Sequence, residues 1–453
     1  MKILRNNSIA AVMSKFASAG FSFVFVWSVA FVLDTRTAGI FLYSYMLVTV
    51  LVQLARAGTE NSMLRIIQST DDRVETISKL VVFLVYVAGM TIIFGGMLFA
   101  LVGLGIIQIY QDTQASQSLW LLLVLALLFG VSQVFGSYFQ IQRNVYSQYW
   151  SLAIFVSFAG CLASALVYFG QSEVDVVQYT LTFLLISMLC FGITLLLLWH
   201  SLGKKCSKEK RHEELVNAKG IQVIKSTMPF ALLTFIHITT QWGGQLLSGG
   251  WLKEEELAML SVATRLAMLT NFVFLALAAL LAPSYSKLYE ENKINQFEAI
   301  SLRSVGLSTL FSLTLILIFI VFGKAILAFF GAEYQAAYWA LVILSAGWLV
   351  CVIVGPTSEI LLMTDRTREV RKSLIVSSII TVILSLILIP LFRVEGAAIA
   401  GALGLTALSL QNYAKVKKAY GINFLSPKSQ AAQLGSIWQM FFVQGWRLNK
   451  RNV

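Results

Sequence analysis

The chain has 453 residues, of which 58% are hydrophobic and 12% charged, and its mean hydropathy is +0.78. A soluble domain carries about 25% charged residues, so half of the charge expected of a soluble protein is absent. This composition excludes an ordinary soluble enzyme and indicates an integral membrane protein. The net charge of +12 does not by itself indicate a nucleic-acid partner, because cytoplasmic loops of membrane proteins carry an excess of Lys and Arg.

Apolar runs that are long enough to cross a bilayer recur along the whole chain. A helix needs about 20 such residues to span the hydrocarbon core. The basic start of the chain is followed by an apolar stretch with polar interruptions, which favours a retained first helix over a cleaved signal peptide. We predict twelve membrane-spanning helices, at 8–33, 37–57, 79–109, 118–140, 147–170, 175–200, 221–249, 256–282, 302–330, 336–363, 372–392 and 396–414.

The basic residues divide unequally between the two sides of these predicted helices. One side carries 28 of the 34 Lys and Arg residues and the other side carries four. Because basic loops stay in the cytoplasm, we predict that both termini are cytoplasmic. The charged segment 204–220 is the longest polar connection, and it separates two predicted six-helix lobes, 1–203 and 221–420. In the tail, 421–453, aromatic and aliphatic residues share a helical face ahead of basic residues, which predicts an interfacial amphipathic helix.

The predicted extramembrane segments do not favour catalysis. The outer loops are about three to nine residues long, too short for the periplasmic site that a glycan polymerase or ligase needs. The inner loops contain no G-x-x-x-x-G-K-[ST] phosphate-binding motif. The three histidines are scattered, and the four cysteines lack metal-ligand spacing. We therefore expect no enzyme activity, no catalytic residue, no metal site and no resident cofactor.

We single out three basic residues among those within or at the ends of predicted spans, where a charge costs about 2.5–3.5 kcal/mol to insert. They are Lys15 in the first span, Arg56 at the end of the second and Arg265 in the eighth. A guanidinium deep in a helix bundle binds anions, above all phosphates. We predict that the three form a cationic, substrate-binding cavity. The alternatives are a snorkelling Lys15, an Arg56 that anchors the inner surface, and an Arg265 paired with Glu359 or Asp34.

Uncharged polar side chains align along single faces of two predicted spans, and another follows Arg265. A lipid-facing surface would not keep such groups aligned, so we predict that they line a lumen. For His237 the alternative is a buried hydrogen bond between helices. The predicted lumen-lining residues are Tyr45, Thr49, Gln53, Thr234, His237, Gln241, Gln245 and Asn271.

Four short motifs in the second half carry a family resemblance. They are APSYSKLY at 282–289, GAEY at 331–334, LLMTDR at 361–366 and PLFRVEGAAIA at 390–400. With these motifs the chain resembles the polysaccharide-biosynthesis transporters, the O-antigen (Wzx-type) flippases of the multidrug/oligosaccharidyl-lipid/polysaccharide (MOP) superfamily. The first half is similar mainly in its layout.

The resemblance implies an all-α membrane fold with two six-helix lobes around a central cavity, as in MATE-like transporters. It also implies alternating access and a polyprenyl-diphosphate-linked oligosaccharide as cargo. This cargo would be an O-antigen, capsule or exopolysaccharide repeat unit that moves from the cytoplasmic to the periplasmic leaflet of a bacterial inner membrane. Related lipid II flippases are similar in placing basic residues in spans one, two and eight, where Lys15, Arg56 and Arg265 stand here.

Other functions remain open at this point. A cation-coupled multidrug exporter with the same fold would be expected to carry carboxylates within its spans, and these are nearly absent here. A membrane-embedded glycan polymerase or ligase and a non-transporting assembly scaffold are further alternatives. Coupling to a Na+ or H+ gradient is possible for a transporter of this kind. The expected partners are the lipid-linked glycan, membrane lipids, and a polymerase or other glycan-assembly proteins, with no nucleic acid.

Overall fold

A computed structural model of the chain describes nine stretches of backbone, and the regular elements within them are all helices. This confirms the predicted all-α fold class. The contacts divide the chain into two compact units. Unit 1 comprises Met1–Ile238 and Gly249–Ser261, and unit 2 comprises Thr239–Ser248 and Val262–Val453. The described residues are 2–59, 62–63, 73–103, 113–142, 144–170, 174–203, 234–291, 293–364 and 366–424.

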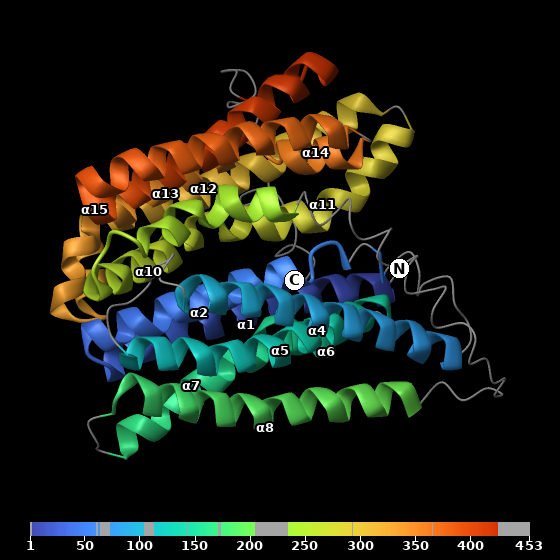
Figure 1. The fold of residues 1–453 in the computed structure, drawn as a ribbon. Helices are drawn as coiled ribbons and strands as arrows, with labels where there is room; N and C mark the ends of the chain where they lie inside the picture. Colours follow the sequence, from blue (N-terminus) through green and yellow to red (C-terminus); the bar gives the residue numbers. More distant parts are fainter. Residues whose placement is uncertain are drawn as a thin grey trace, which may run out of the picture. The chain divides into compact units, whose positions relative to one another are not determined.

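Unit 1 is a bundle of long helices (Figure 1). Its helices are α1 (Lys2–Val32), α2 (Thr35–Ala55), α4 (Arg73–Gly103), α5 (Thr113–Ile141), α6 (Val145–Tyr149), the π-helix η1 (Trp150–Ile154), α7 (Phe155–Phe169) and α8 (Val176–Gly203). Helix α5 packs against α2, α4 and α8, and α7 packs against α1 and α8. Because α5 contacts so many of the other helices, its side chains reach most of the interior of unit 1.

Aromatic rings fill the interior of unit 1 between α1, α2 and α8. The rings of Phe41 and Tyr179 have centroids 4.8 Å apart and meet edge to face, as do those of Phe25 and Tyr45 at 5.3 Å. Phe183 stacks on Phe25 at 5.6 Å. Helices in lipid gain little from the hydrophobic effect and associate through close packing, for which such rings are well suited. The cluster therefore holds these three helices together as a fixed scaffold.

Unit 2 is also helical. A helix over residues 234–248 enters it, and α10 (Glu254–Met268) begins in unit 1 and ends in unit 2. The elements that follow are the 3-10 helix η2 (Leu269–Asn271), α11 (Phe272–Glu290), α12 (Ile294–Ala328), the 3-10 helix η3 (Ala332–Ala337), α13 (Tyr338–Val354), α14 (Thr357–Met363) and α15 (Thr367–Tyr420). Helix α13 packs against both α12 and α15.

Helix α15 is a helical hairpin with its tip at Arg393. A straight helix of its 54 residues would be about 80 Å long, far more than the roughly 30 Å of a bilayer core. Arg393 has non-helical backbone angles, with φ at 50°. On either side of it the chain runs back along itself: Gln411 donates to the Ser377 hydroxyl, and Lys415 donates to the Ser373 hydroxyl at 2.6 Å. The break lies in the predicted connection between the spans at 372–392 and 396–414.

A close helix contact joins residues 239–248 to this hairpin within unit 2. The Thr240 hydroxyl is 2.8 Å from that of Ser378, in the first arm of α15. At Gly244 an added Cβ would lie 2.8 Å from the carbonyl oxygen of Ala397, in the second arm. Glycine is needed here because only a missing side chain lets the two backbones approach so closely.

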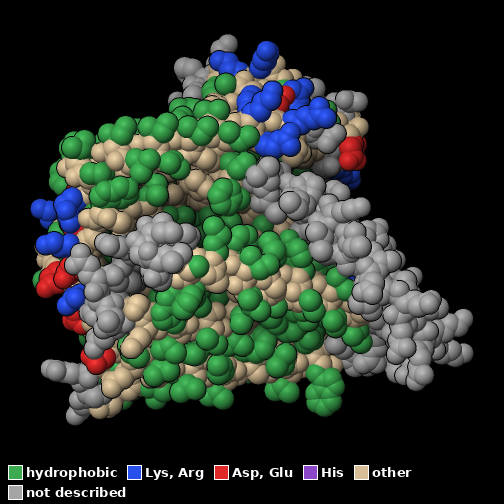
Figure 2. Space-filling model, viewed as in Figure 1, with side chains coloured by type: hydrophobic (Ala, Val, Ile, Leu, Met, Phe, Trp, Pro, Cys, Tyr) green, Lys and Arg blue, Asp and Glu red, His purple; other side chains and the backbone are tan. Residues whose placement is uncertain are grey.

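The described helices have the length and composition of membrane spans. Among the described residues, eight helices are long and apolar enough to cross a membrane. The number is nine if the bent pair Tyr146–Leu152 and Phe155–Phe169 forms one span. Large apolar side chains on them are exposed, for example Leu189 at 76%. In Figure 2 such side chains cover the flanks of the helices, and charged side chains gather near helix ends. The protein is therefore a multi-pass membrane protein, while the count of twelve stays a prediction.

Only some of the predicted lobe boundaries fall within the described residues. The linker 204–220 and most of the tail, 425–453, lie outside the described residues. At the start of the tail, Gly421 ends α15 in a left-handed conformation, and Ile422 and Phe424 are buried. The lobe limits, the linker and the interfacial tail helix therefore remain predictions.

Candidate functional site

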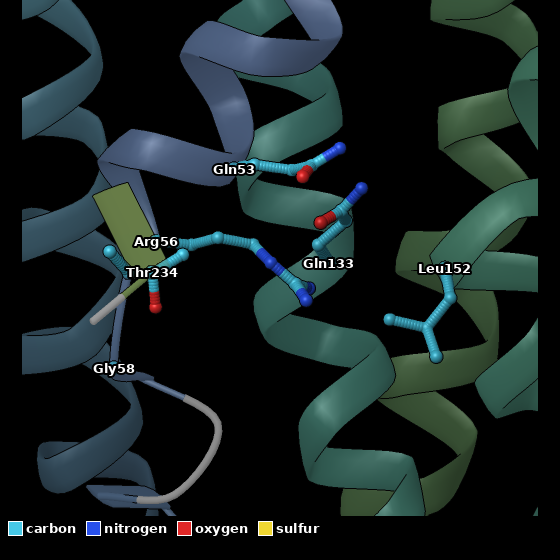
Figure 3. A pocket seen from close by; sticks show the side chains of 7 residues that line it. Gln53, Arg56, Gly58, Gln133, Leu152 and Thr234 are labelled. Atoms are coloured by element: carbon cyan, nitrogen blue, oxygen red, sulfur yellow. The ribbon is translucent and has the colours of Figure 1, made fainter. Parts of the chain in front are cut away.

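A cavity of about 340 Å³ opens within unit 1 (Figure 3). This cavity, which we call the Arg56 cavity, is lined by Gln53, Arg56, Ala57, Gly58, Gln133, Leu152 and Thr234. Three of these, Gln53, Arg56 and Thr234, are among the residues that the sequence predicts for the substrate cavity or its lumen. The structure therefore brings together residues from the second and seventh predicted spans, and adds two from the fourth and fifth.

Arg56 supplies the positive charge of this cavity. It caps the C-terminus of α2, where its backbone N–H donates to the carbonyl of Val52. The hydroxyl of Thr59 donates to the Arg56 carbonyl at 2.7 Å, which fixes the turn that follows. A helix C-terminus carries partial negative charge, which attracts cations. In the absence of a nearby basic side chain, this charge would repel an anionic ligand. The partly buried guanidinium reverses the sign at this end of α2 and presents donors that match phosphate oxygens.

Two amide side chains stand beside this guanidinium. Gln53 precedes Arg56 by three residues, so both extend from one face of α2 toward α5, and Gln133 of α5 lies on the facing side (Figure 3). Gln133 is 8% exposed. A carboxamide both donates and accepts hydrogen bonds, so the pair can bind hydroxyl or amide groups of a ligand. The cavity is thus suited to an anionic, oxygen-rich group.

Leu152 closes the cavity from the side opposite α2 (Figure 3). It belongs to the π-helix η1, which follows α6. The hydroxyl of Ser132 on α5 donates to the carbonyl of Ser151 at 2.8 Å, and both residues are fully buried. This bond ties η1 to α5 next to Gln133. Sequence reasoning missed Gln133 and Leu152; the polar pair Ser132–Gln133 within an apolar run was the one signal available for the first of them.

The predicted polar stripe of the second span divides between two environments. Tyr45 is 7% exposed and lies in the aromatic cluster of unit 1, and the Thr49 hydroxyl donates to the Met46 carbonyl within its own helix. Only the later members, Gln53 and Arg56, reach the cavity. The backbone of Lys15 is helical, but its side chain lies outside the described residues.

The remaining predicted residues lie on the helices after the predicted linker. The guanidinium carbon of Arg265 stands 5.8 Å from the ring centroid of Trp242, a cation–π contact within unit 2. Asp34, one predicted alternative partner of Arg265, accepts a hydrogen bond from the backbone N–H of Thr37 and caps α2, and its pairing with Arg265 stays a prediction. Arg56 belongs to unit 1 and Arg265 to unit 2, so their joint cavity stays a prediction.

The predicted uncharged residues of these helices differ in exposure. The side chain of His237 is exposed and that of Gln241 is partly buried. Gln245 is 9% exposed, and Asn271, in η2, is 4% exposed. Lumen-lining roles for these four residues stay predictions. Within the described part of the chain, no three His, Cys, Asp or Glu side chains are grouped closely enough to hold a metal ion.

The chain is similar in sequence to families of membrane transport and polysaccharide biosynthesis proteins. A family model described as polysaccharide biosynthesis protein matches residues 4–289, and one described as MatE matches residues 234–391. The probable low-salt glycan biosynthesis flippase Agl15 of Haloferax volcanii is 27% identical over 198 residues. This match covers 43% of the chain and 40% of that relative, which is less than half of each.

Two solved structures show the same fold. The lipid II flippase MurJ in an inward closed conformation has a TM-score of 0.65 at 14% identity, covering 97% of this chain and 92% of that one. The MATE multidrug transporter DinF-BH has a TM-score of 0.65 at 14% identity, covering 94% and 97%. At these identities the likeness is one of fold, and it confirms the predicted MOP-type architecture.

Proposed function

This chain belongs to the polysaccharide biosynthesis protein family, and on that premise we propose that it is a flippase for lipid-linked glycans. The observation that carries the proposal is that the family match, over residues 4–289, includes every residue that lines the Arg56 cavity. The similarity to a protein described as a glycan biosynthesis flippase supports the same function.

The proposed cargo is a polyprenyl-diphosphate-linked oligosaccharide, such as an O-antigen, capsule or exopolysaccharide repeat unit. Its diphosphate binds the guanidinium of Arg56, and its polar sugars contact the carboxamides of Gln53 and Gln133. The isoprenoid chain stays in the lipid, because exposing its apolar surface to water would cost free energy. Arg265 and Lys15 are the proposed further cationic contacts. No covalent bond changes in this process, so the protein acts as a transporter and not as an enzyme.

The direction of transport follows from where such glycans are built and used. The cargo is loaded from the cytoplasmic leaflet of the bacterial inner membrane and released to the periplasmic leaflet by alternating access, with both termini of the chain in the cytoplasm. A Na+ or H+ gradient is the proposed energy source. A glycan polymerase and other assembly proteins are the proposed partners on the periplasmic side.

Loss of the basic side chains tests this function in cells. In a strain whose own copy is deleted, Arg56→Gln and Arg265→Gln should each abolish surface glycan, because the cargo loses a charged partner. Arg36→Gln is the matched control: Arg36 is exposed at the start of α2, about 30 Å along the helix from Arg56. With matched membrane levels, normal surface glycan in both Arg56→Gln and Arg265→Gln would refute the proposal.

A second candidate is a cation-coupled multidrug exporter, which the MatE match over residues 234–391 favours. The charge of the described cavity argues against a cationic drug, because Arg56 would repel it. The two candidates are separated by measuring efflux of a cationic dye from cells that overproduce the protein. Dye efflux that is lost in the cavity variants, together with unchanged surface glycan, would favour the exporter.

A further inference from the structure

Among the described residues that line the Arg56 cavity, one has a large apolar side chain, Leu152. The guanidinium of Arg56 and the amides of Gln53 and Gln133 stand on α2 and α5, and Leu152 faces them from η1 (Figure 3). A ligand that is anionic at one end and offers both hydroxyl groups and an apolar surface would match this lining. A sugar ring bonded to a phosphate has these properties, because its C–H groups form an apolar face between the hydroxyls.

The π-helix is what brings Leu152 to this position. A π-helix inserts one extra residue into a helical turn, which rotates the residues on one side of it by about 100° relative to those on the other. The helix axis also bends by 61° between Tyr146–Leu152 and Phe155–Phe169. Such insertions are frequent at functional sites. Leu152, within this π-helix, forms one wall of the cavity.

Helix α5 is adapted to this insertion at two neighbouring positions. Ser132 donates to the Ser151 carbonyl, which holds η1 in place. One turn further on, Gly136 lies so close to Leu152 that an added Cβ would stand 2.7 Å from its Cγ. Any larger residue at 136 would push Leu152 away from α5. The position of Leu152 is therefore fixed by the same helix that carries Gln133.

The size of the cavity limits what it can enclose. Its volume of about 340 Å³ is near the lower end of the range of roughly 300–1,000 Å³ that is usual for small-ligand sites. That volume is enough for a phosphate group and one sugar ring.

We propose that Leu152 is a specificity-determining residue, which packs against the apolar face of the sugar that is bonded directly to the phosphate. This inference rests on the proposed flippase function. In this arrangement Arg56 binds the phosphate, the two glutamine amides bind the ring hydroxyls, and Leu152 limits the size and orientation of the ring. The cavity thus distinguishes cargoes by their first sugar, whatever the rest of the glycan.

Two soluble probes separate the anion contact from the sugar contact. Inorganic pyrophosphate offers charge alone, and glucose 1-phosphate offers a phosphate and one ring. Binding of each is measured by calorimetry on the full-length protein in lipid nanodiscs. Leu152→Ala should weaken glucose 1-phosphate binding about tenfold and change pyrophosphate binding less than twofold, because only the ring contacts the leucine. Arg56→Gln should weaken binding of both probes.

Further variants guard against a folding defect. Gly136→Ala leaves Leu152 in the sequence but displaces it, so it should weaken glucose 1-phosphate binding selectively. Leu152→Met nearly conserves the side-chain volume and should retain it. Leu166→Ala, at a 60% exposed position of α7, is the matched control and should change nothing.

The possible results separate this inference from the proposed function. If Leu152→Ala leaves the binding of both probes unchanged, or weakens it equally, Leu152 does not contact the sugar ring. The proposed flippase function would not be affected by that result. If Arg56→Gln leaves pyrophosphate binding unchanged, the anion role of the cavity fails. If the unmodified protein binds neither probe, the cavity is not a phosphosugar site and both proposals fall.

Discussion

Removing the hydroxyl of Ser132 probes how the π-helix shapes the cavity. Ser132 and Ser151 are fully buried, and the hydrogen bond between them is 2.8 Å long. A buried hydrogen bond contributes about 1 kcal/mol net. If this bond holds η1 in its binding geometry, its loss reduces the population of that geometry about fivefold. Ser132→Ala should therefore weaken glucose 1-phosphate binding about fivefold and leave pyrophosphate binding unchanged.

The same helix offers a matched control for this change. Ser137 is 3% exposed, and its hydroxyl donates to the Gln133 carbonyl within α5 at 3.1 Å. Ser137→Ala removes a hydrogen bond of the same type without touching η1. Both variants should lower the melting temperature by a similar small amount, and only Ser132→Ala should change sugar-phosphate affinity. Equal affinities in the two variants would refute the role given to the Ser132 bond.

Two further predictions concern the scaffold of unit 1. An added Cβ at Gly39 would lie 1.8 Å from the carbonyl oxygen of Glu254, so Gly39→Ala should destabilise the protein by about 3 kcal/mol, seen as a lower melting temperature in detergent. Gly20→Ala, with nothing within 4 Å of its Cβ, should not, and equal losses would contradict this packing. Tyr179→Phe removes a 2.8 Å hydrogen bond to Ser164 while keeping the ring, so it should cost about 1 kcal/mol in the same assay. A loss as large as that of Tyr179→Ala would show that the hydroxyl, not the ring, carries the packing.

Sequence patterns predicted the helices well because membrane spans must satisfy their own backbone hydrogen bonds. Even the turn at Arg393 falls within a predicted connection, because a proline, a basic residue and a glycine interrupt the apolar run there. The two arms of the α15 hairpin correspond to two separate predicted spans, 372–392 and 396–414. The helical period also placed Gln53 and Arg56 on one face, and both line the cavity.

The sequence could not predict which neighbour each part of a helix would face. Tyr45 shares the helical face of Gln53, but it lies two turns earlier in α2, where that face meets aromatic rings instead of the cavity. The role of Leu152 in the cavity could not be predicted either, because nothing in the run WSLAI at 150–154 distinguishes a π-helix from an α-helix. A one-residue change of register depends on packing against Ser132 and Gly136, which are distant in sequence.

Movement of a lipid-linked glycan across the bilayer by way of the Arg56 cavity can be measured directly. The most direct test reconstitutes the purified protein in liposomes that carry a polyprenyl-diphosphate-linked sugar on both leaflets. A membrane-impermeant enzyme added outside then consumes the exposed sugar. The account predicts that the unmodified protein and Arg36→Gln let the enzyme consume all of the sugar, whereas Arg56→Gln slows consumption of the inner half at least tenfold. Consumption that stops at half with the unmodified protein, or equal rates with Arg56→Gln, would contradict it.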